Sequence, residues 1–502
     1  MTQSGPPVDT GETPGSGGLG AAVRSGTRLL TASQASLQVV RMLVAIVLAR
    51  LLVPSDFGLV AMAYIVVNFL DIFKDLGTKA AMVQRRTMSR AFASTVFVVN
   101  VVVGVTITAL VVVCAPLVAL LYGDPAVTPV LQVLGGVIGI SSLGLVHQAH
   151  LHRQLRFGRL AVLHLAIAIT NAVVSLGLAF AGFGVWALVW GTLAGSLAAN
   201  TLAWLFSDLR LTRSFSWDHV REIRSFSLNL SGSQVFGFTV NNADKFIVGR
   251  WLGAGALGHY NIAQRIIMYP VRSVTQVLQE VLFPAMARIQ DDNRALGRGY
   301  LRALSGISLL TFPAMLGVAV VSGPFVRGVL GPSWEPAIPV IAIIAPVGAL
   351  QSVLQTVSPL YAVKGRTDWL LRWTMAAGAV TVAAYVVGLP WGVVGVAAAY
   401  AVAHVLLFYP AFAIPFRLIE LPFPALLRAL APTAGASVAM AGAVLALRIW
   451  LESRGVEPLT VLAACIGGGI LIYIALMALI RPPAVEELRR LIWQKRWRTS
   501  DA

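Results

Sequence analysis

The sequence predicts an all-α polytopic membrane protein, and three observations carry this prediction. Of its 502 residues, 57% are hydrophobic and only 12% are charged, whereas soluble proteins carry about 25% charged residues. The mean hydropathy is +0.79. Apolar runs of about 20 residues, long enough to cross a bilayer as helices, recur from one end of the chain to the other. A soluble enzyme, a collagen, a coiled coil and a disordered chain are therefore excluded.

About fourteen segments are long enough to span a bilayer. They cover residues 29–52, 57–80, 93–121, 127–146, 159–181, 185–206, 226–249, 256–283, 301–322, 337–362, 370–388, 393–413, 426–449 and 459–480. Residues 1–23 are rich in Gly, Pro, Ser and Thr and are expected to form a disordered cytosolic tail.

The distribution of basic residues supports this number of spans. The net charge is +17, and most of the 38 lysines and arginines fall in every second loop and in the two tails. Basic loops stay on the cytosolic side of a membrane, so an even number of spans with both termini in the cytosol is expected. Because the cations lie in short loops between apolar runs, they indicate membrane orientation, and no nucleic-acid partner is expected.

An internal repeat divides the spans into two sets. Ten residues of segment 24–63 recur, without gaps, in segment 224–263. They include Arg24, Ser25, Ser33, Gln34, Arg50 and Gly58, which match Arg224, Ser225, Ser233, Gln234, Arg250 and Gly258. A weaker pair starts at Gly184 and Gly395. Since the second copy starts six spans later, the copies have the same orientation, as in transporters that rock two lobes about a central site.

The repeat predicts the domain organisation. It places an N-terminal lobe at 24–207, a cytosolic inter-lobe loop at 208–224, a C-terminal lobe at 225–413, an appended hairpin at 426–480 and a basic cytosolic tail at 481–502.

Polar stripes on the first two spans of each repeat carry the functional prediction, because an ionisable residue facing lipid is costly. We expect these helices to face one another and to line a cavity. The predicted polar lining is Gln34, Gln38, Asn68, Gln234, Asn241, Asn261, Gln276 and Gln279. The predicted cations are Arg41, Lys245, Arg265 and Arg272, and the carboxylates are Asp71, Asp75, Asp244 and Glu280. Arg41 is nearly mid-span and has no acidic residue in its own helix.

A purely structural interpretation of some of these residues stays open. Lys74 with Asp71, and Lys245 with Asp244, can form ion pairs that only hold helices together. Pro270 is available to kink the helix over 256–283. The pairs Gly135 with Gly139 and Gly191 with Gly195 have the spacing of close helix contacts. Histidines His164 and His404 in apolar runs are expected to be core residues.

No cofactor or metal site is predicted. Cys114 and Cys465 each lie alone in an apolar run, and the histidines near residue 150 have no acidic neighbour. Motifs for nucleotide binding, zinc proteases and serine hydrolases are absent from the sequence. We therefore expect a secondary transporter rather than an enzyme.

Two long runs resemble a known family. These are LLVPSDFGLVAMAYIVVNFLDIFKDLGTKAAMVQRR at 51–86 and NADKFIVGRWLGAGALGHYNIAQRIIMYPVRSVTQVLQEVLFPAMARIQDD at 242–292. With GFGVWALV at 182–189 and KGRTDWLLRW at 364–373, they resemble the polysaccharide flippase branch of the multidrug/oligosaccharidyl-lipid/polysaccharide exporter superfamily. The similarity is greatest to the Wzx-like subgroup of colanic and teichuronic acid exporters, and it covers roughly residues 25–480.

The resemblance implies a V-shaped, two-lobed fold with alternating access in a bacterial cytoplasmic membrane. It also implies an undecaprenyl-diphosphate-linked oligosaccharide as substrate, with glycosyltransferases and a polymerase of the same pathway as partners. Arginines suit a diphosphate because they combine charge with forked donors, so Arg41, Lys245, Arg265 and Arg272 are the candidates for binding it. Asp71, Asp75, Asp244 and Glu280 are the candidates for proton or sodium coupling.

Alternatives stay open at this point. A small-molecule drug exporter shares the superfamily fold, but an excess of basic residues is unsuited to organic cations. A peptidoglycan-precursor flippase, a membrane-embedded polymerase or ligase, and a scaffold for glycan export are further candidates. A polymerase usually needs a large outside loop, and the outside loops predicted here are short.

Overall fold

The computed structural model describes residues 40–75, 78, 82, 85 and 88–481. For residues 75, 222–234, 236, 269–270, 272–281 and 283–285 it describes the backbone only. Throughout the described part of the chain, the regular structure is helical, which confirms the all-α prediction. The chain divides into two compact units, Met1–Gly258 and His259–Ala502.

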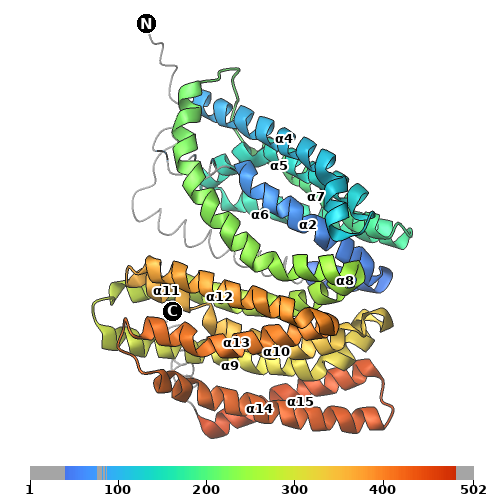
Figure 1. Cartoon of the computed structure of the whole chain (residues 1–502), viewed down its shortest axis with the longest axis vertical. Helices are drawn as coiled ribbons and strands as arrows, with labels where there is room; N and C mark the ends of the chain where they lie inside the picture. Colours follow the sequence, from blue (N-terminus) through green and yellow to red (C-terminus); the bar gives the residue numbers. More distant parts are fainter. Residues whose placement is uncertain (1–39, 76–77, 79–81, 83–84, 86–87, 482–502) are drawn as a thin grey trace, which may run out of the picture. The chain divides into compact units, whose positions relative to one another are not determined.

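The N-terminal unit is built from long helices (Figure 1). Residues 40–51 are helical, and α2 (Pro54–Asp75), α4 (Arg90–Tyr122), α5 (Val127–Arg153), α6 (Phe157–Phe180), α7 (Val185–Phe206) and the first part of α8 (Trp217–Arg288) follow. The most extensive contacts join α4 with α5 and α6 with α7, and α5 also packs against α2 and α7.

Small residues allow these helix pairs to approach closely. A Cβ added at Gly135 or Gly139 would lie 2.6 Å from Val111 Cγ1 or 3.0 Å from Thr108 Oγ1, both on α4. Gly191 and Gly195 face α6 in the same way, at 1.8 Å from Ser175 Oγ and 2.9 Å from the carbonyl oxygen of Ile167. The predicted close contacts are therefore confirmed at both pairs of glycines.

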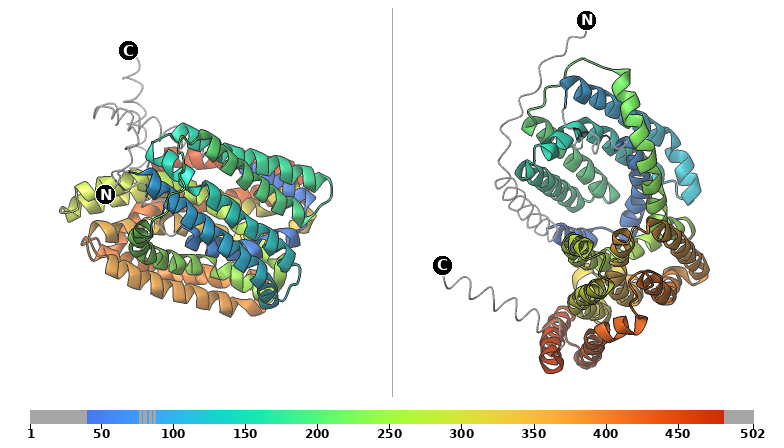
Figure 2. Two further views of the ribbon diagram at one scale, coloured as in Figure 1. Left: turned by 90° about the horizontal axis from the view of Figure 1, so that it is seen from above. Right: turned by 90° about the vertical axis from the view of Figure 1, so that its left-hand side faces the viewer.

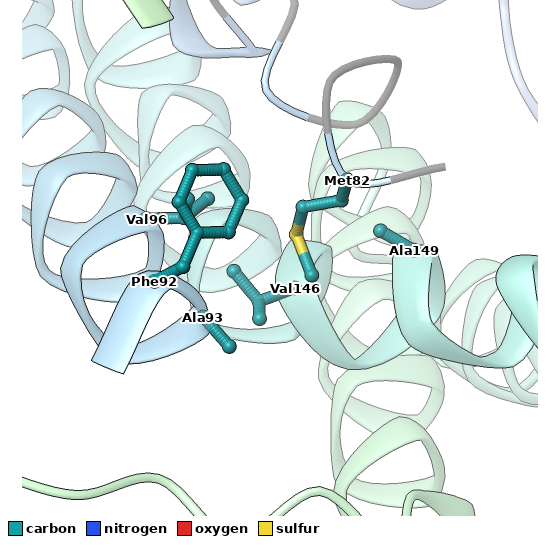
Figure 3. Packing of buried hydrophobic residues seen from close by; sticks show 6 residues of the cluster. All are labelled: Met82, Phe92, Ala93, Val96, Val146 and Ala149. Carbon is teal, nitrogen blue, oxygen red and sulfur yellow. The ribbon is translucent and has the colours of Figure 1, made fainter. Parts of the chain in front are cut away.

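A hydrophobic cluster joins α4 and α5 at one end of the unit. Phe92 and Val96 of α4 point toward Val146 and Ala149 of α5, and Met82 from the preceding segment fills the space between them (Figure 3). All of these side chains are at most 2% exposed. The start of α4, the end of α5 and the segment before α4 are thus fastened together by apolar burial.

The long helix α8 is interrupted at Gly253, whose φ of 84° and ψ of 178° are not helical. The break lies between the two spans predicted at 226–249 and 256–283, whereas Pro270 lies inside a helical stretch. Glycine suits such a position because it has no Cβ to clash with a left-handed backbone.

Just past this break, α8 crosses the first turn of α2 backbone to backbone. A Cβ at Gly58 would lie 1.8 Å from the carbonyl oxygen of Ala254, and one at Gly258 would lie 1.9 Å from that of Pro54. Gly58 and Gly258 are equivalent positions of the sequence repeat. The contact is therefore reciprocal. Gly58 meets the carbonyl of Ala254, four residues before Gly258, and Gly258 meets the carbonyl of Pro54, four residues before Gly58.

The C-terminal unit is a bundle of helices, several of which are seen end-on in the right-hand view of Figure 2. Its helices are the end of α8, α9 (Asn293–Phe325), α10 (Ala337–Leu354), α11 (Val357–Val363), α12 (Thr367–Gly388), α13 (Gly392–Phe416), α14 (Phe423–Ser453) and α15 (Pro458–Ile480). Short turns η1 (Val326–Leu330), η2 (Pro332–Trp334) and η3 (Leu389–Trp391) connect some of them. Helix α9 packs against α10, α14 and α15, and α13 packs against α10 and α12.

Ten helical stretches of the described residues are long and apolar enough to cross a membrane. The predicted spans from 57–80 to 185–206 and from 301–322 to 459–480 fall on them, and the stretch Thr367–Phe416 covers two predicted spans. Helix α8 covers 226–249 and 256–283 but is not among the ten. Of the first predicted span, 29–52, only residues 40–52 are described. The two compact units divide after Gly258. The inter-lobe loop at 208–224 stays a prediction.

Candidate functional site

The predicted stripe on α2 contains an ion pair between a buried lysine and a partly exposed aspartate. Lys74 Nζ lies 2.7 Å from Asp71 Oδ1 and donates a hydrogen bond of 2.8 Å to Ser141 Oγ of α5. The Lys74 side chain is 8% exposed and that of Asp71 is 45% exposed. Because Lys74 is in the last turn of α2, its charge also interacts favourably with the helix dipole.

A second polar contact lies four residues after Lys74 in the sequence. Thr78 and Asn100 of α4 are fully buried and exchange hydrogen bonds of 3.2 Å through their side chains. The Lys74 hydrogen bond thus joins the end of α2 to α5, and this contact joins Thr78 to α4. The arrangement favours the helix-fastening interpretation of Lys74 with Asp71, while Asp71 keeps an accessible carboxylate.

The first part of α8 carries three of the predicted residues in succession. Lys245 is half-buried, and its Nζ donates to Asn242 Oδ1 at 3.4 Å. Asp244 is only 3% exposed. Asn241 is exposed, and its side chain donates a 2.8 Å hydrogen bond to the carbonyl oxygen of Gly237 one turn earlier. Lys245 and Asn241 are thus accessible, whereas Asp244 lies inside the unit.

The remaining candidates are distributed over both units. Arg41 and Asn68 are exposed in the N-terminal unit, and in the C-terminal unit Arg265 is exposed and Asn261 is half-buried. Outside the described residues lie Gln34 and Gln38, and the side chains of Asp75, Gln234, Arg272, Gln276, Gln279 and Glu280 are not described either. The roles of all these residues stay predictions.

A polar cluster inside the C-terminal unit was not predicted from the sequence. Gln351 of α10 contacts both Tyr400 and His404 of α13, through a short hydrogen bond from its Nε2 to the Tyr400 hydroxyl and a separation of 3.3 Å between its Nε2 and His404 Nε2. Tyr385 of α12 stacks on Tyr400, with ring centroids 5.6 Å apart. The signal in the sequence was the spacing of Tyr400 and His404, one helical turn apart in an otherwise apolar run.

Each unit also has a basic residue that holds the backbone of a preceding loop. Arg153, at the end of α5, donates to the carbonyl oxygens of Met82 at 3.0 Å and of Arg85. Lys364, just after α11, donates to the carbonyl oxygen of Gln290 at 2.5 Å and to Asn293 Oδ1 at 2.6 Å. The two cations are separated in the sequence by the same interval as Gly184 and Gly395. The repeat therefore extends to this interaction, although the residue types differ.

A salt bridge forms just after α7 at Asp208, which lies outside the predicted spans. Arg156 donates to Asp208, and Arg159 lies 3.9 Å from the same carboxylate. The hydrogen bond from Arg156 holds the pKa of Asp208 below its usual range. Arg159 also donates to the carbonyl oxygen of Phe206 at 2.5 Å, so the two arginines fasten the end of α7 to the start of α6.

Comparison with known families identifies the family of this chain. The family model described as polysaccharide biosynthesis protein matches residues 47–339, which is more than half of the chain. The chain belongs to this family. The match runs from the end of the first predicted span to the start of α10, and so it includes α2 and all of α8.

Three relatives have names that refer to the biosynthesis of lipopolysaccharide, teichuronic acid or succinoglycan. Over 351 residues the chain is 28% identical to the lipopolysaccharide biosynthesis protein WzxC of Escherichia coli, covering 68% of this chain and 70% of the relative. It is 28% identical over 311 residues to the teichuronic acid biosynthesis protein TuaB of Bacillus subtilis, covering 61% and 64%. It is 25% identical over 342 residues to the succinoglycan biosynthesis transport protein ExoT of Rhizobium meliloti, covering 68% and 69%.

Solved structures show the same fold at low sequence identity. The lipid II flippase MurJ, in an inward closed conformation, matches with a TM-score of 0.68 at 14% identity, over 90% of this chain and 98% of that one. An inward-facing multidrug resistance MATE family transporter of the MOP superfamily matches with a TM-score of 0.64 at 17% identity, over 78% and 98%. The fold is therefore that of the MOP transporters.

Proposed function

We propose that this protein is a flippase that moves lipid-linked oligosaccharide repeat units across the bacterial cytoplasmic membrane for the synthesis of a cell-surface polysaccharide. The main support for this proposal is the family match over residues 47–339. Relatives named for lipopolysaccharide, teichuronic acid and succinoglycan biosynthesis support the same proposal. Both termini are proposed to be cytosolic, as the distribution of basic loops predicts.

The proposed substrate is an oligosaccharide on an undecaprenyl diphosphate carrier. Its diphosphate must cross a hydrocarbon layer in which a bare anion is strongly disfavoured. Arg41, Lys245, Arg265 and Arg272 are the proposed ligands because guanidinium and ammonium groups form charge-assisted hydrogen bonds with phosphate oxygens. Accessibility supports this role, since Arg41 and Arg265 are exposed and Lys245 is half-buried.

The membrane potential favours outward movement of such a substrate. A headgroup with two negative charges gains about 5 kcal/mol at 100 mV, inside negative, because each charge contributes about 2.3 kcal/mol. The protein itself then has to supply a path and two alternating openings. Asp71, Asp75, Asp244 and Glu280 are the proposed sites for any additional coupling to protons or sodium ions.

A multidrug exporter is the main competing proposal, since the MATE transporter has the same fold. Likeness at 17% identity extends to the fold alone. The predicted stripes have a basic excess, which attracts anions rather than the organic cations that many drugs are. We therefore rank the glycan flippase first.

The test measures translocation of a lipid-linked glycan in inverted vesicles from cells without a flippase of their own. Arg41→Ala is expected to lower the rate by about 10- to 100-fold, because a hydrogen bond to a charged group contributes about 1.5–3 kcal/mol. Arg41→Lys is expected to restore part of it. Arg428→Ala, an exposed arginine of α14, is the matched control and should transport at the wild-type rate.

Two outcomes would contradict the proposal at different levels. If Arg41→Ala transports as fast as wild type, Arg41 is not a substrate ligand. If wild-type vesicles move no lipid-linked glycan but expel organic cations, the drug-exporter proposal replaces the flippase.

A further inference from the structure

The cluster of Gln351, Tyr400 and His404 inside the C-terminal unit has unusual hydrogen bonding. His404 is at the middle of α13, and its Nδ1 lies 3.1 Å from the carbonyl oxygen of Tyr400. A carbonyl oxygen only accepts, so Nδ1 must carry a proton. In a neutral imidazole, Nε2 is then an acceptor, and it faces Gln351 Nε2 at 3.3 Å. These heavy-atom positions fit a neutral His404.

The other end of the Gln351 carboxamide is not satisfied in this state. Its Oε1 is buried and has no hydrogen-bond partner among the described residues. A buried acceptor without a partner is costly. A half turn of the carboxamide exchanges two groups of nearly the same shape. It would bring Oε1 to both His404 Nε2 and the Tyr400 hydroxyl and would leave the amide nitrogen at the position without a partner, so only the added charge of an imidazolium can favour it.

That second orientation is compatible only with a protonated His404. Nε2 must then carry a hydrogen to donate to Oε1, and the Tyr400 hydroxyl can donate to the same oxygen. Thus one proton added at Nε2 converts the imidazole to imidazolium, and the carboxamide turns to accept from it. The ring centroids of Tyr400 and His404 are 4.1 Å apart. An aromatic ring close to a cation stabilises its charge.

We propose that His404, Gln351 and Tyr400 form a proton-binding site, in which protonation of His404 Nε2 is coupled to rotation of the Gln351 carboxamide. The site joins α10 to α13, which pack against each other beside α12 (Figure 1). Protonation therefore reverses the hydrogen bonds that hold two helices of the C-terminal unit together.

The surroundings favour a proton over a metal cation. Neither α10 nor α13 contains Asp, Glu, Lys or Arg, and sodium or calcium would need several oxygen ligands. The ionisable groups on the elements that pack against α13 are Asp368, Arg372 and Tyr385 of α12, Tyr361 of α11, and Arg428, Arg448 and Glu452 of α14; α13 itself adds Tyr400 and Tyr409. Asp368 and Arg372 lie in the first six residues of α12, far along the helix from Tyr385, and Arg448 pairs with Glu452 at 3.0 Å.

The site is tested by nuclear magnetic resonance of the full chain in lipid nanodiscs with nitrogen-15-labelled histidine. The chain has seven histidines, and the resonance missing from His404→Gln assigns the one of interest. We expect this imidazole to take up a proton as the pH is lowered within the range in which the protein stays folded. In Gln351→Leu its proton affinity should fall at least about tenfold, because the charged state loses its acceptor.

Two further variants separate this effect from misfolding. Tyr400→Phe keeps the ring and removes the hydroxyl, so its proton affinity should change in the same direction but less. His164→Gln removes a different resonance and should leave the titration of His404 unchanged. A His404 that stays neutral over this range, or one that titrates identically in wild type and Gln351→Leu, would overturn the proposal.

A role of this site in coupling rests on the proposed flippase function. In vesicles with an imposed pH difference, wild type should move glycan faster than without it, and His404→Gln should lose that acceleration. An equal acceleration in both would refute the coupling role. If wild type moves no glycan, the flippase proposal fails, while the titration still decides whether the proton site exists.

Discussion

The crossing of α2 and α8 offers a direct test of the repeat architecture. Gly58→Ala places a Cβ 1.8 Å from the carbonyl oxygen of Ala254 and 2.5 Å from its carbon. Ordinary contacts begin at 3.4 Å, so the two backbones must separate by about 1.6 Å. No side-chain rotation can relieve this overlap, because the atoms of Ala254 belong to the backbone and the position of the Cβ is fixed by the backbone of residue 58.

The expected cost follows from known overpacking. Inserting one methyl group into a tightly packed core costs about 1–3 kcal/mol, and a backbone contact belongs at the upper end of that range. Alanine gains up to about 1 kcal/mol over glycine in a helix interior. Gly255→Ala adds the same methyl group in the first turn after the break at Gly253 without the clash, since no atom lies within 4 Å of a Cβ there. We expect Gly58→Ala to be about 2–3 kcal/mol less stable than Gly255→Ala.

Thermal unfolding in detergent measures this difference. One kcal/mol corresponds to at least about 2 °C in Tm for a unit of this size, so Gly58→Ala should unfold at least about 4 °C below Gly255→Ala. Gly258→Ala should behave like Gly58→Ala. The double variant should lose less than the sum, because helices already separated accommodate the second methyl group. Equal Tm values for Gly58→Ala and Gly255→Ala would refute the crossing.

Three further predictions concern the charged contacts. Asp71→Asn should destabilise the N-terminal unit by about 1–3 kcal/mol, because Lys74 stays buried without its carboxylate, and Lys74→Met in the same chain should recover most of this; a purely additive double variant in denaturation would contradict the pair. Because Arg156 lowers the pKa of Asp208 in the folded state, the pair contributes stability above the usual aspartate range and loses it as pH falls through the folded pKa. Asp208→Asn should therefore lower Tm slightly at pH 7 and by progressively less as the pH falls below the usual aspartate range, since exposed pairs contribute less than about 1 kcal/mol; a difference that grows on acidification would contradict the argument. Lys364→Met should raise amide hydrogen exchange at residues 290–293 without changing exchange in α14, and unchanged exchange at 290–293 would contradict the loop contact.

Hydropathy was enough to predict the helical segments. Spans from 57–80 to 459–480 coincide with helices, because a residue's tendency to leave water depends on its own side chain and its neighbours in sequence. The repeat identified Gly58 and Gly258 as equivalent residues. The glycine pairs on α5 and α7 were correctly predicted as helix contacts from their spacing alone.

Other features depend on how helices are rotated and paired, which no local pattern contains. Lys74 had candidate partners within one turn, and the structure pairs it with Asp71 while adding Ser141 from another helix. His404 looked like an isolated core residue until α10 brought Gln351 beside it.

The sequence by itself determined the membrane fold class, the repeat and the family resemblance, since each depends on residue type and spacing along the chain. Only the tertiary structure decided why Gly58 must be glycine and what His404 contacts. Both depend on distances of a few ångströms between helices far apart in sequence, and those distances result from the packing of the whole unit.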